Sequence, residues 1–277
     1  MNKHQTSPTL ELLPPLREVI AKFQLSTKRS LGQHFLLDTN LTDRIARIAK
    51  IEGATVIEIG PGPGGLTRSL LHQGAEKVIA VEKDQHCLTA LEDLRRIYPD
   101  RLTLLKADAL NLDLTHLSSS PCNIVANLPY NISTVLLINW LQHIEHVERM
   151  TLMFQKEVAE RLTASPSTKE YGRLSVIVQW LCEVKPQFNV DSKAFLPPPK
   201  VASSVVTLIP RSKPVANADW QFLEKVTFAA FNQRRKMLRS SLKDFNFDFR
   251  ALELDPTLRA ENLTVEQFCR LARSATG

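Results

Sequence analysis

The chain has 277 residues, of which 43% are hydrophobic, and a formal net charge of +6 at pH 7. This length suits one large α/β domain with a small additional domain, and the apolar content is sufficient to fill a core. Apolar runs such as residues 135–138 fall far below the roughly 18 residues of a membrane-spanning helix, and the amino terminus lacks a charged-then-apolar secretory pattern. We therefore expect a cytoplasmic protein with no membrane partner.

The four cysteines are scattered along the sequence, with no paired short spacing, at Cys87, Cys122, Cys182 and Cys269. Zinc and redox motifs require closely spaced pairs, so this pattern argues against both. We expect free, buried thiols in a reducing compartment and no metal site.

Residues 1 to about 40 are predicted to form an arm and a helix that precede the first strand. The segment 55–59 then indicates a short β-branched strand, which runs into a glycine turn containing Gly60, Gly62 and Gly65, with a helix beginning at Leu66. Such a turn lets the backbone approach a ligand, and the helix amino terminus behind it favours negative groups. An ordinary structural turn is the alternative.

The next apolar strand, residues 77–81, ends at Glu82, about 20 residues after the glycine turn. A carboxylate at this place can accept hydrogen bonds from both ribose hydroxyls of an adenosine. That chemistry serves NAD and S-adenosylmethionine equally, so the two features predict an adenosine-type cofactor without choosing between them.

Two further strand candidates also end in polar residues. Residues 101–106 lead to Asp108, and residues 122–126 lead to Asn127. The carboxyl ends of parallel strands line the ligand crevice of an open sheet, so Gly60, Glu82, Asp108 and Asn127 are expected to converge. Asp108 is a candidate contact for the adenine amine of the cofactor, although a lone Asp after a strand is also a common helix N-cap.

The tetrapeptide Asn127-Leu128-Pro129-Tyr130 is typical of an amine-methylating site. Adenine N6 is a poor nucleophile because its lone pair is delocalised into the ring, and hydrogen-bond acceptors draw that pair back onto nitrogen. The Asn127 side-chain oxygen and the Leu128 carbonyl can accept both N6 hydrogens, Pro129 fixes the turn, and Tyr130 offers a stacking face. A plain turn after a strand also fits these residues.

Strands and helices continue to alternate as far as Ile209, which predicts a doubly wound sheet. Residues 152–155 and 174–178 are strand candidates, and residues 156–162 are predicted to form a helix that leads to a mobile polar loop near the substrate. A linker over residues 210–214 is followed by helical periodicity. The predicted domains are therefore residues 1–209, α/β, and residues 215–277, all-helical.

The positive charge gathers in two places. Lys28 and Arg29 form one cluster, and the other lies in a predicted helix whose apolar residues share one face, with basic residues Arg234, Arg235, Lys236, Arg239 and Lys243. Such a helix can pack and still present charge to nucleic acid phosphates, although basic stripes on surface helices are often merely solvated.

With these motifs in order, the chain resembles the KsgA family of small-subunit rRNA adenine N6,N6-dimethyltransferases over most of its length. The resemblance rests on residues 30–36, 58–62, 127–133, 195–201 and 230–236. It implies the Rossmann-like fold of class I methyltransferases, S-adenosylmethionine as methyl donor, and donor contacts at His34, Leu36, Gly60, Gly62, Glu82, Asp108 and Asn127. Many relatives carry Asn at the position of His34, so the role of this imidazole is less certain and can depend on pH.

The resemblance also implies that Phe195, which precedes three prolines, stacks on the target adenine opposite Tyr130. A core anchor for the proline loop is the alternative. The expected reaction is direct in-line methyl transfer to N6 of adenosines near the 3′ end of small-subunit (16S) rRNA. We expect the substrate to be a pre-30S particle, the reaction to be coupled to subunit biogenesis, and the enzyme to be a monomer. Alternatives are a non-catalytic assembly factor, a large-subunit rRNA methyltransferase and, less well matched, an NAD-dependent oxidoreductase.

Overall fold

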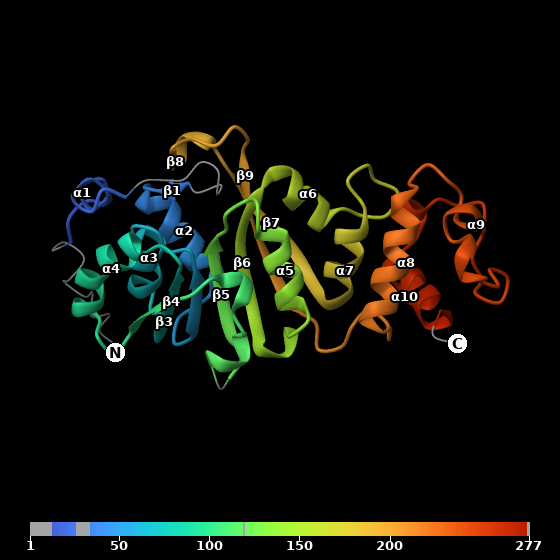
Figure 1. The fold of residues 1–277 in the computed structure, drawn as a ribbon, viewed down its shortest axis with the longest axis horizontal. Helices are drawn as coiled ribbons and strands as arrows, with labels where there is room; N and C mark the ends of the chain where they lie inside the picture. Colours follow the sequence, from blue (N-terminus) through green and yellow to red (C-terminus); the bar gives the residue numbers. More distant parts are fainter. Residues whose placement is uncertain (1–12, 26–33, 119, 276–277) are drawn as a thin grey trace, which may run out of the picture. The chain divides into compact units, whose positions relative to one another are not determined.

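The structure is a computed structural model that describes residues 13–25, 34–118 and 120–275 (Figure 1). The predicted basic cluster at Lys28 and Arg29 lies outside the described residues. In chain order, the first six helices are α1 (Leu16–Lys22), α2 (Thr39–Ala49), α3 (Gly65–His72), α4 (Gln85–Ile97), α5 (Ser133–Leu141) and α6 (Lys156–Thr163). They are followed by α7 (Arg173–Leu181), α8 (Trp220–Asn232), α9 (Leu238–Ser241) and α10 (Val265–Ser274).

Seven strands form one sheet in the order β4-β3-β2-β5-β6-β9-β7. Their bounds are β2 (Thr55–Ile59), β3 (Lys77–Glu82), β4 (Leu102–Lys106), β5 (Cys122–Asn127), β6 (Val147–Gln155), β7 (Cys182–Val190) and β9 (Ser203–Pro210). The pairs β3 with β4, β2 with β3, β2 with β5 and β5 with β6 are all parallel. The carboxyl ends of these five strands therefore lie along one edge.

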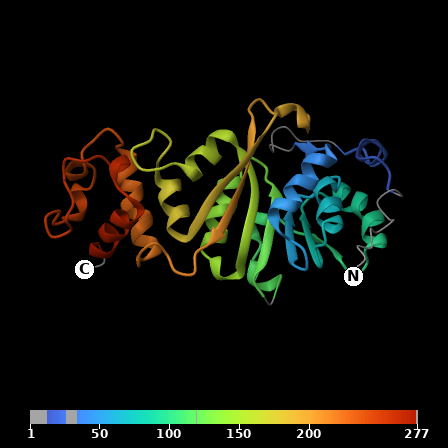
Figure 2. The same cartoon turned by 180° about the vertical axis from the view of Figure 1, so that it is seen from behind.

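Helices cover both faces of the parallel strands. Helix α5 lies in front of the sheet in Figure 1, whereas α2 lies in front in Figure 2, which views the molecule from behind. Helices α2 and α3 pack on each other, and α4 packs against β3 and β4. This arrangement confirms the predicted doubly wound, Rossmann-like sheet.

The local sequence explains why these elements form. Asp38 and Asp84 precede α2 and α4 and accept hydrogen bonds from the first free backbone N–H groups, which is the ordinary action of an N-cap. Strand β2 is buried along nearly its whole length, as expected for a parallel strand covered on both faces. Its Val56 belongs to a core cluster that includes Leu70 of α3 and Val125 of β5.

A second, two-stranded sheet joins segments that are far apart in the sequence. Strand β1 (Phe35–Leu36) pairs antiparallel with β8 (Phe195–Leu196), so that Phe35 faces Leu196 and Leu36 faces Phe195. The pairing fixes the segment that begins at His34 against the proline-rich segment that follows Phe195. Both segments carried motifs of the family resemblance, and the structure brings them together.

The chain divides into two compact units. The N-terminal unit comprises residues 1–156 and 187–207, and the C-terminal unit comprises residues 157–186 and 208–277. This division differs from the predicted domains, 1–209 and 215–277, because α7 packs against α8 and α10 and thereby belongs with the carboxyl-terminal helices. Residues 215–277 themselves are helical, as predicted. Within the described residues, no helix is both long enough and apolar enough to cross a membrane.

Two sequence predictions in the C-terminal unit are wrong. Residues 174–178 form part of helix α7 and not a strand, because a short apolar run that is buried on several sides cannot be assigned by periodicity alone. The long basic helix is also interrupted: α8 ends at Asn232 and α9 begins at Leu238. The backbone N–H of Leu238 donates to Leu258, and Met237 pairs with Arg259, so the chain turns to meet another segment.

The interruption separates the basic residues that were predicted to share one stripe. Arg234, Arg235 and Lys236 lie in the turn between α8 and α9, whereas Arg239 is in α9 and Lys243 follows it. Phe228, which was expected on the packed face, is 56% exposed. Four of the basic side chains are exposed, at Arg235, Lys236, Arg239 and Lys243.

Arg234 is different because its guanidinium is bound within the C-terminal unit. It donates to Glu261 at 2.8 Å, to the carbonyl of Thr168 at 3.2 Å and to the carbonyl of Lys169 at 2.5 Å. These contacts tie the turn after α8 to the loop before α7. Arg234 is therefore a structural residue of this unit.

Replacing Arg234 with Ala is expected to lower the free energy of unfolding by about 1–2 kcal/mol, because three acceptors lose a charged donor at a half-exposed site. Thermal or urea denaturation measures the change. Arg235→Ala is the matched control, since this neighbouring side chain is exposed, and it should leave the unfolding curve in place. Equal curves for the two variants would contradict the structural assignment of Arg234.

Candidate active site

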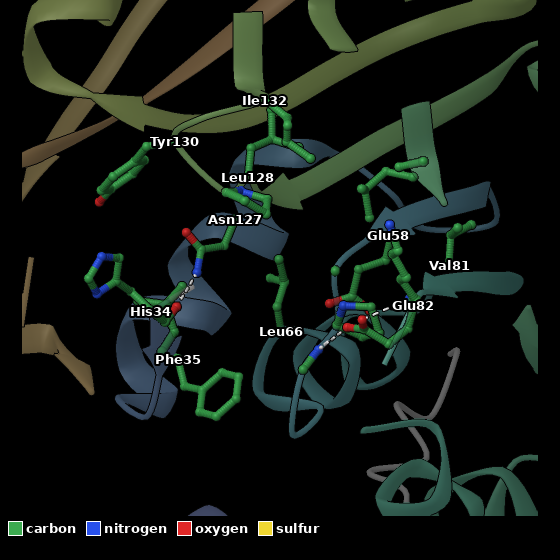
Figure 3. Close-up of a pocket in the computed structure, with 18 of the residues that line it drawn as sticks. His34, Phe35, Glu58, Leu66, Val81, Glu82, Asn127, Leu128, Tyr130 and Ile132 are labelled. Atoms are coloured by element: carbon green, nitrogen blue, oxygen red, sulfur yellow. Dashed lines mark hydrogen bonds between the residues drawn. The ribbon is translucent and has the colours of Figure 1, made fainter. Parts of the chain in front are cut away.

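A cavity of about 320 Å³ lies in the N-terminal unit at the carboxyl edge of the parallel strands (Figure 3). Ten of the residues predicted from the sequence to form the site line it: His34, Leu36, Gly60, Gly62, Glu82, Asp108, Asn127, Leu128, Pro129 and Tyr130. Phe195 is the exception. The four strand ends that were expected to converge therefore do so, together with the segment around β1.

The glycine turn after β2 lines the cavity and lets a ligand approach the protein backbone closely. Gly60 has a positive φ of +68°, and a Cβ built there would meet no atom within 4 Å. Its open side belongs to the cavity lining, so the absence of a side chain keeps this space available. At Gly62, with φ of +55°, a Cβ would lie 3.0 Å from the Phe35 ring, so any side chain would require that ring to shift by a few tenths of an ångström.

Glu82 lies at the end of β3 with its carboxylate in the cavity. One oxygen accepts from the backbone N–H groups of Lys83 at 2.8 Å and Asp84 at 2.9 Å, and the other accepts a longer bond from Gly62 at 3.4 Å. Burial raises the pKa of Glu82, and these backbone donors oppose the rise. Three of the roughly four acceptor positions of this carboxylate are occupied, so Glu82 retains one position, on the oxygen that faces Gly62, for a ribose hydroxyl.

Asp108 is an N-cap, one of the two roles that the sequence left open, and it also lines the cavity. Its Oδ1 accepts from the Leu110 N–H at 3.1 Å and caps the 3₁₀ turn Ala109–Asn111, while Oδ2 accepts from Lys83 Nζ at 2.6 Å. The hydrogen bond from Lys83 is the main cause of a lowered Asp108 pKa. The residue is thus an N-cap that also presents an ionised carboxylate to the cavity.

The Asn127 side chain is oriented by one hydrogen bond. Its Nδ2 donates to the backbone carbonyl of His34 at 2.9 Å, which joins the end of β5 to the segment before β1. A carbonyl only accepts, so the amide nitrogen must face it and the amide oxygen must face away. Figure 3 shows that oxygen directed into the space beside Tyr130. The side chain therefore offers an acceptor to the cavity.

His34 and Tyr130 flank this acceptor. His34 Nδ1 lies 2.7 Å from the carbonyl of Pro197, so Nδ1 carries a hydrogen and the other ring nitrogen is available to a ligand. The Tyr130 hydroxyl is bonded to Ser203, and its ring centroid lies 5.5 Å from that of His34. Burial raises the Tyr130 pKa, with the Ser203 contact opposing the rise. The hydroxyl thus holds the phenol ring in place.

Phe195 lies outside the cavity lining. Its side chain is 3% exposed, belongs to the main core cluster and is absent from the cavity lining. The pairing of β1 with β8 carries it into the apolar interior, where its ring makes an edge contact with His34. This position agrees with the alternative, a core anchor for the proline segment, and stacking of Phe195 on the target adenine stays a prediction.

Glu58 is a cavity residue to which the sequence assigned no role. It lies within β2, is 1% exposed, and its Oε2 is buried with no hydrogen-bond partner among the described residues. Burial raises its pKa to about 8; Thr67 opposes this rise and Glu82 adds to it. The sequence signal that could have found Glu58 is a carboxyl group inside an otherwise apolar strand. At neutral pH the group is mostly protonated.

The chemistry of the lining fits an adenosine. Two carboxyl groups, Glu82 and Asp108, lie at the ends of the adjacent strands β3 and β4, and the glycine turn follows β2, the next strand of the sheet. Apolar side chains such as Leu66, Val81 and Ile132 supply the remaining walls. Over residues 13–25, 34–118 and 120–275, no group of three or more His, Cys, Asp or Glu side chains is arranged to hold a metal ion.

Comparison with known proteins identifies the family. Residues 24–276 match the model of a family described as ribosomal RNA adenine dimethylase. The chain belongs to this family. The ribosomal RNA small subunit methyltransferase A of Rhodospirillum rubrum is 57% identical over 266 residues, which are 95% of this chain and 92% of that protein.

Two solved structures of methyltransferases share the fold. A dimethyladenosine transferase from Plasmodium falciparum has a TM-score of 0.75 and 28% identity, over 86% of this chain and 96% of that chain. The 23S rRNA methyltransferase ErmE has a TM-score of 0.68 and 25% identity, over 88% of this chain and 100% of that one. The fold is therefore that of class I methyltransferases, which generally use S-adenosylmethionine.

Replacing Glu58 with Gln is expected to change how stability depends on pH. The folded-state pKa of about 8 lies above the ordinary value of 4.5, so the unfolded chain releases this proton first as pH rises. The contribution of Glu58 to stability is full below about pH 4.5 and is lost as pH rises toward 8. Denaturation midpoints across this window should fall less steeply for Glu58→Gln than for the wild type.

Glu52→Gln is the control for this experiment, because Glu52 is an exposed carboxylate of the same unit. Its curve should run parallel to that of the wild type. If the Glu58→Gln curve also runs parallel to the wild type, Glu58 does not titrate as the structure implies.

Replacing Phe195 with Ala is expected to lower the free energy of unfolding by about 3–5 kcal/mol, because a buried aromatic ring is removed from the core. Phe195→Leu keeps most of the volume and should cost less than about 1.5 kcal/mol while preserving methylation. Urea denaturation measures the stability of both. Phe228→Ala, at an exposed site, serves as the control; a stable Phe195→Leu protein without activity would favour the stacking role instead.

Proposed function

We propose that this chain is an S-adenosylmethionine-dependent rRNA adenine N6,N6-dimethyltransferase that acts on adenosines near the 3′ end of small-subunit rRNA. The observation that carries the proposal is the hydrogen bond from Asn127 Nδ2 to the His34 carbonyl. Because that bond uses the amide nitrogen, the amide oxygen is left as an acceptor beside Tyr130, where an exocyclic amine needs one. Family membership and the adjoining adenosine-type cavity support the same conclusion.

The residues that would hold the methyl donor follow from the cavity. Glu82 would accept from a ribose hydroxyl, Asp108 from the adenine amine, and the turn at Gly60 and Gly62 would pass beneath the ligand. Leu36 and His34 line the side nearest Asn127. When bound, S-adenosylmethionine supplies a methyl group on a sulfonium, which makes that carbon electrophilic.

The protein prepares the target amine for this electrophile. The Asn127 side-chain oxygen, together with the Leu128 backbone carbonyl, would accept the two N6 hydrogens and so localise the lone pair on nitrogen. Positive charge develops on N6 as it attacks, and the same oxygens stabilise it. Pro129 restricts the turn, and the Tyr130 ring, held through Ser203, offers a face to the base. Positioning of this kind makes the largest contribution to the rate, and the N6 proton can leave to water.

The proposed substrate is rRNA in an immature small subunit, met in the cytoplasm by a monomeric enzyme. The relative that is 57% identical is named for the small subunit, whereas the named large-subunit enzyme is 25% identical. Exposed basic side chains of the C-terminal unit, at Arg235, Lys236, Arg239 and Lys243, are the proposed phosphate contacts. Arg234 is excluded from this group because it is bound within its own unit.

Incubation with tritiated S-adenosylmethionine and immature or mature small subunits tests the function. The expected result is label in N6,N6-dimethyladenosine of the small-subunit rRNA from immature particles. Label confined to large-subunit rRNA would assign the alternative methyltransferase, and the absence of label from a protein that binds its donor would favour a non-catalytic assembly factor.

Asn127→Ala is expected to lower turnover by about 100-fold or more, because the acceptor for the N6 hydrogen is lost, while donor affinity changes far less. Asn127→Asp keeps an acceptor but cannot donate to the His34 carbonyl, so we expect partial activity. Single-turnover methylation and calorimetric binding of S-adenosylhomocysteine measure the two effects. Asn139→Ala, at an exposed position of α5, is the control; wild-type turnover in Asn127→Ala would refute the mechanism.

A further inference from the structure

The ends of β3 and β4 place two opposite charges at the rim of the cavity. Glu82 pairs with Lys106 in the parallel register, and the N–H of Ala107 donates to the Glu82 carbonyl at 3.2 Å. Lys83 follows Glu82 directly, and Asp108 follows Ala107. Their side chains meet, with Nζ of Lys83 2.6 Å from Oδ2 of Asp108.

Both partners belong to the cavity lining. The Lys83 side chain is 76% exposed and that of Asp108 is 28% exposed, so the ion pair borders solvent on one side and the cavity on the other. An exposed pair of this kind contributes little to folding, which makes a purely structural purpose a poor explanation of its position.

The pair fixes the orientation of the Asp108 carboxylate. Oδ1 is bound by the Leu110 N–H and Oδ2 by Lys83, so each oxygen is held by one donor from a different direction. The Lys83 backbone is held as well, because its N–H donates to Glu82. Each carboxylate oxygen still has a second acceptor position, which leaves Asp108 able to receive one more hydrogen bond without losing either partner.

We propose that Lys83 is a positioning residue for the methyl donor, holding the Asp108 carboxylate so that its remaining acceptor position receives the adenine amino group. This inference rests on the proposed function, in which Asp108 contacts that amine. The lowered pKa of Asp108, caused mainly by the Lys83 hydrogen bond, keeps the carboxylate ionised and therefore an acceptor. Lys83 acts through Asp108 and makes no contact of its own with the adenine.

The test is a double-mutant cycle on the affinity for S-adenosylhomocysteine, measured by calorimetry on the full chain. Lys83→Met is expected to weaken binding about two- to fivefold, the range of an exposed ion pair, and Lys83→Arg to restore it. In an Asp108→Asn background the same Lys83→Met change should have no further effect. Raising the salt concentration should reduce the difference between wild type and Lys83→Met, because it screens the pair.

Lys22→Met is the matched control. Lys22 forms an exposed ion pair with Asp93 at 3.5 Å in the same unit, and neither residue lines the cavity, so the affinity should not change. Tighter binding by Lys83→Met would show that Lys83 competes with the ligand, and an undiminished effect in Asp108→Asn would show direct contact. Either result, or unchanged affinity in Lys83→Met, overturns the inference, whereas a wild-type protein that fails to bind S-adenosylhomocysteine would instead overturn the proposed function.

Discussion

The parallel pairing of β4, β3, β2 and β5 brings the ends of four separated segments to one edge of the sheet. Strands β2, β3 and β5 are buried along most of their length, whereas β4 is only partly buried, and each of the four ends at or just before a residue that can bind a ligand. Asp108, Glu82, Gly60 and Asn127 come together only because their strands are in register. A shift of one strand by a single residue would turn its side chains to the other face and remove its member from the cavity.

A second constraint closes the cavity from outside the sheet. The antiparallel pair of β1 and β8 holds His34 and Pro197 together, and the amide of Asn127 is bonded to the His34 backbone. One backbone carbonyl thus determines which way the Asn127 amide points. The proposed methyl-transfer chemistry depends on this orientation, since the reversed amide would present donors to an amine that needs acceptors.

The cavity also differs in charge from one end to the other. Near the glycine turn, Glu58 and Glu82 are both buried, and burial raises the pKa of each. At the rim, Asp108 is held ionised by an exposed lysine. The adenosine end of the proposed ligand therefore meets a fixed carboxylate, while the deeper acid at Glu58 is largely neutral near pH 7.

The order of apolar runs and polar residues along the chain was enough to predict the sheet and the residues that converge at its edge. Buried parallel strands are nearly continuous apolar runs, and the residues that end them are visible as glycine, carboxylate or amide, so Gly60, Glu82, Asp108 and Asn127 were all predicted correctly as residues that converge. Local rules also found the glycine turn and the helix after it.

Other features follow from contacts between distant segments, because the conformation of each of these segments depends on what packs against it. Residues 174–178 are part of helix α7, which packs against α8 and α10. The predicted basic helix is interrupted before Leu238, whose backbone N–H donates to the carbonyl of Leu258. Phe195 lies in the core because β8 pairs with β1. Arg234 is held within the C-terminal unit because its guanidinium donates to Glu261. Periodicity describes one segment at a time, whereas these outcomes follow from contacts between residues far apart in the sequence.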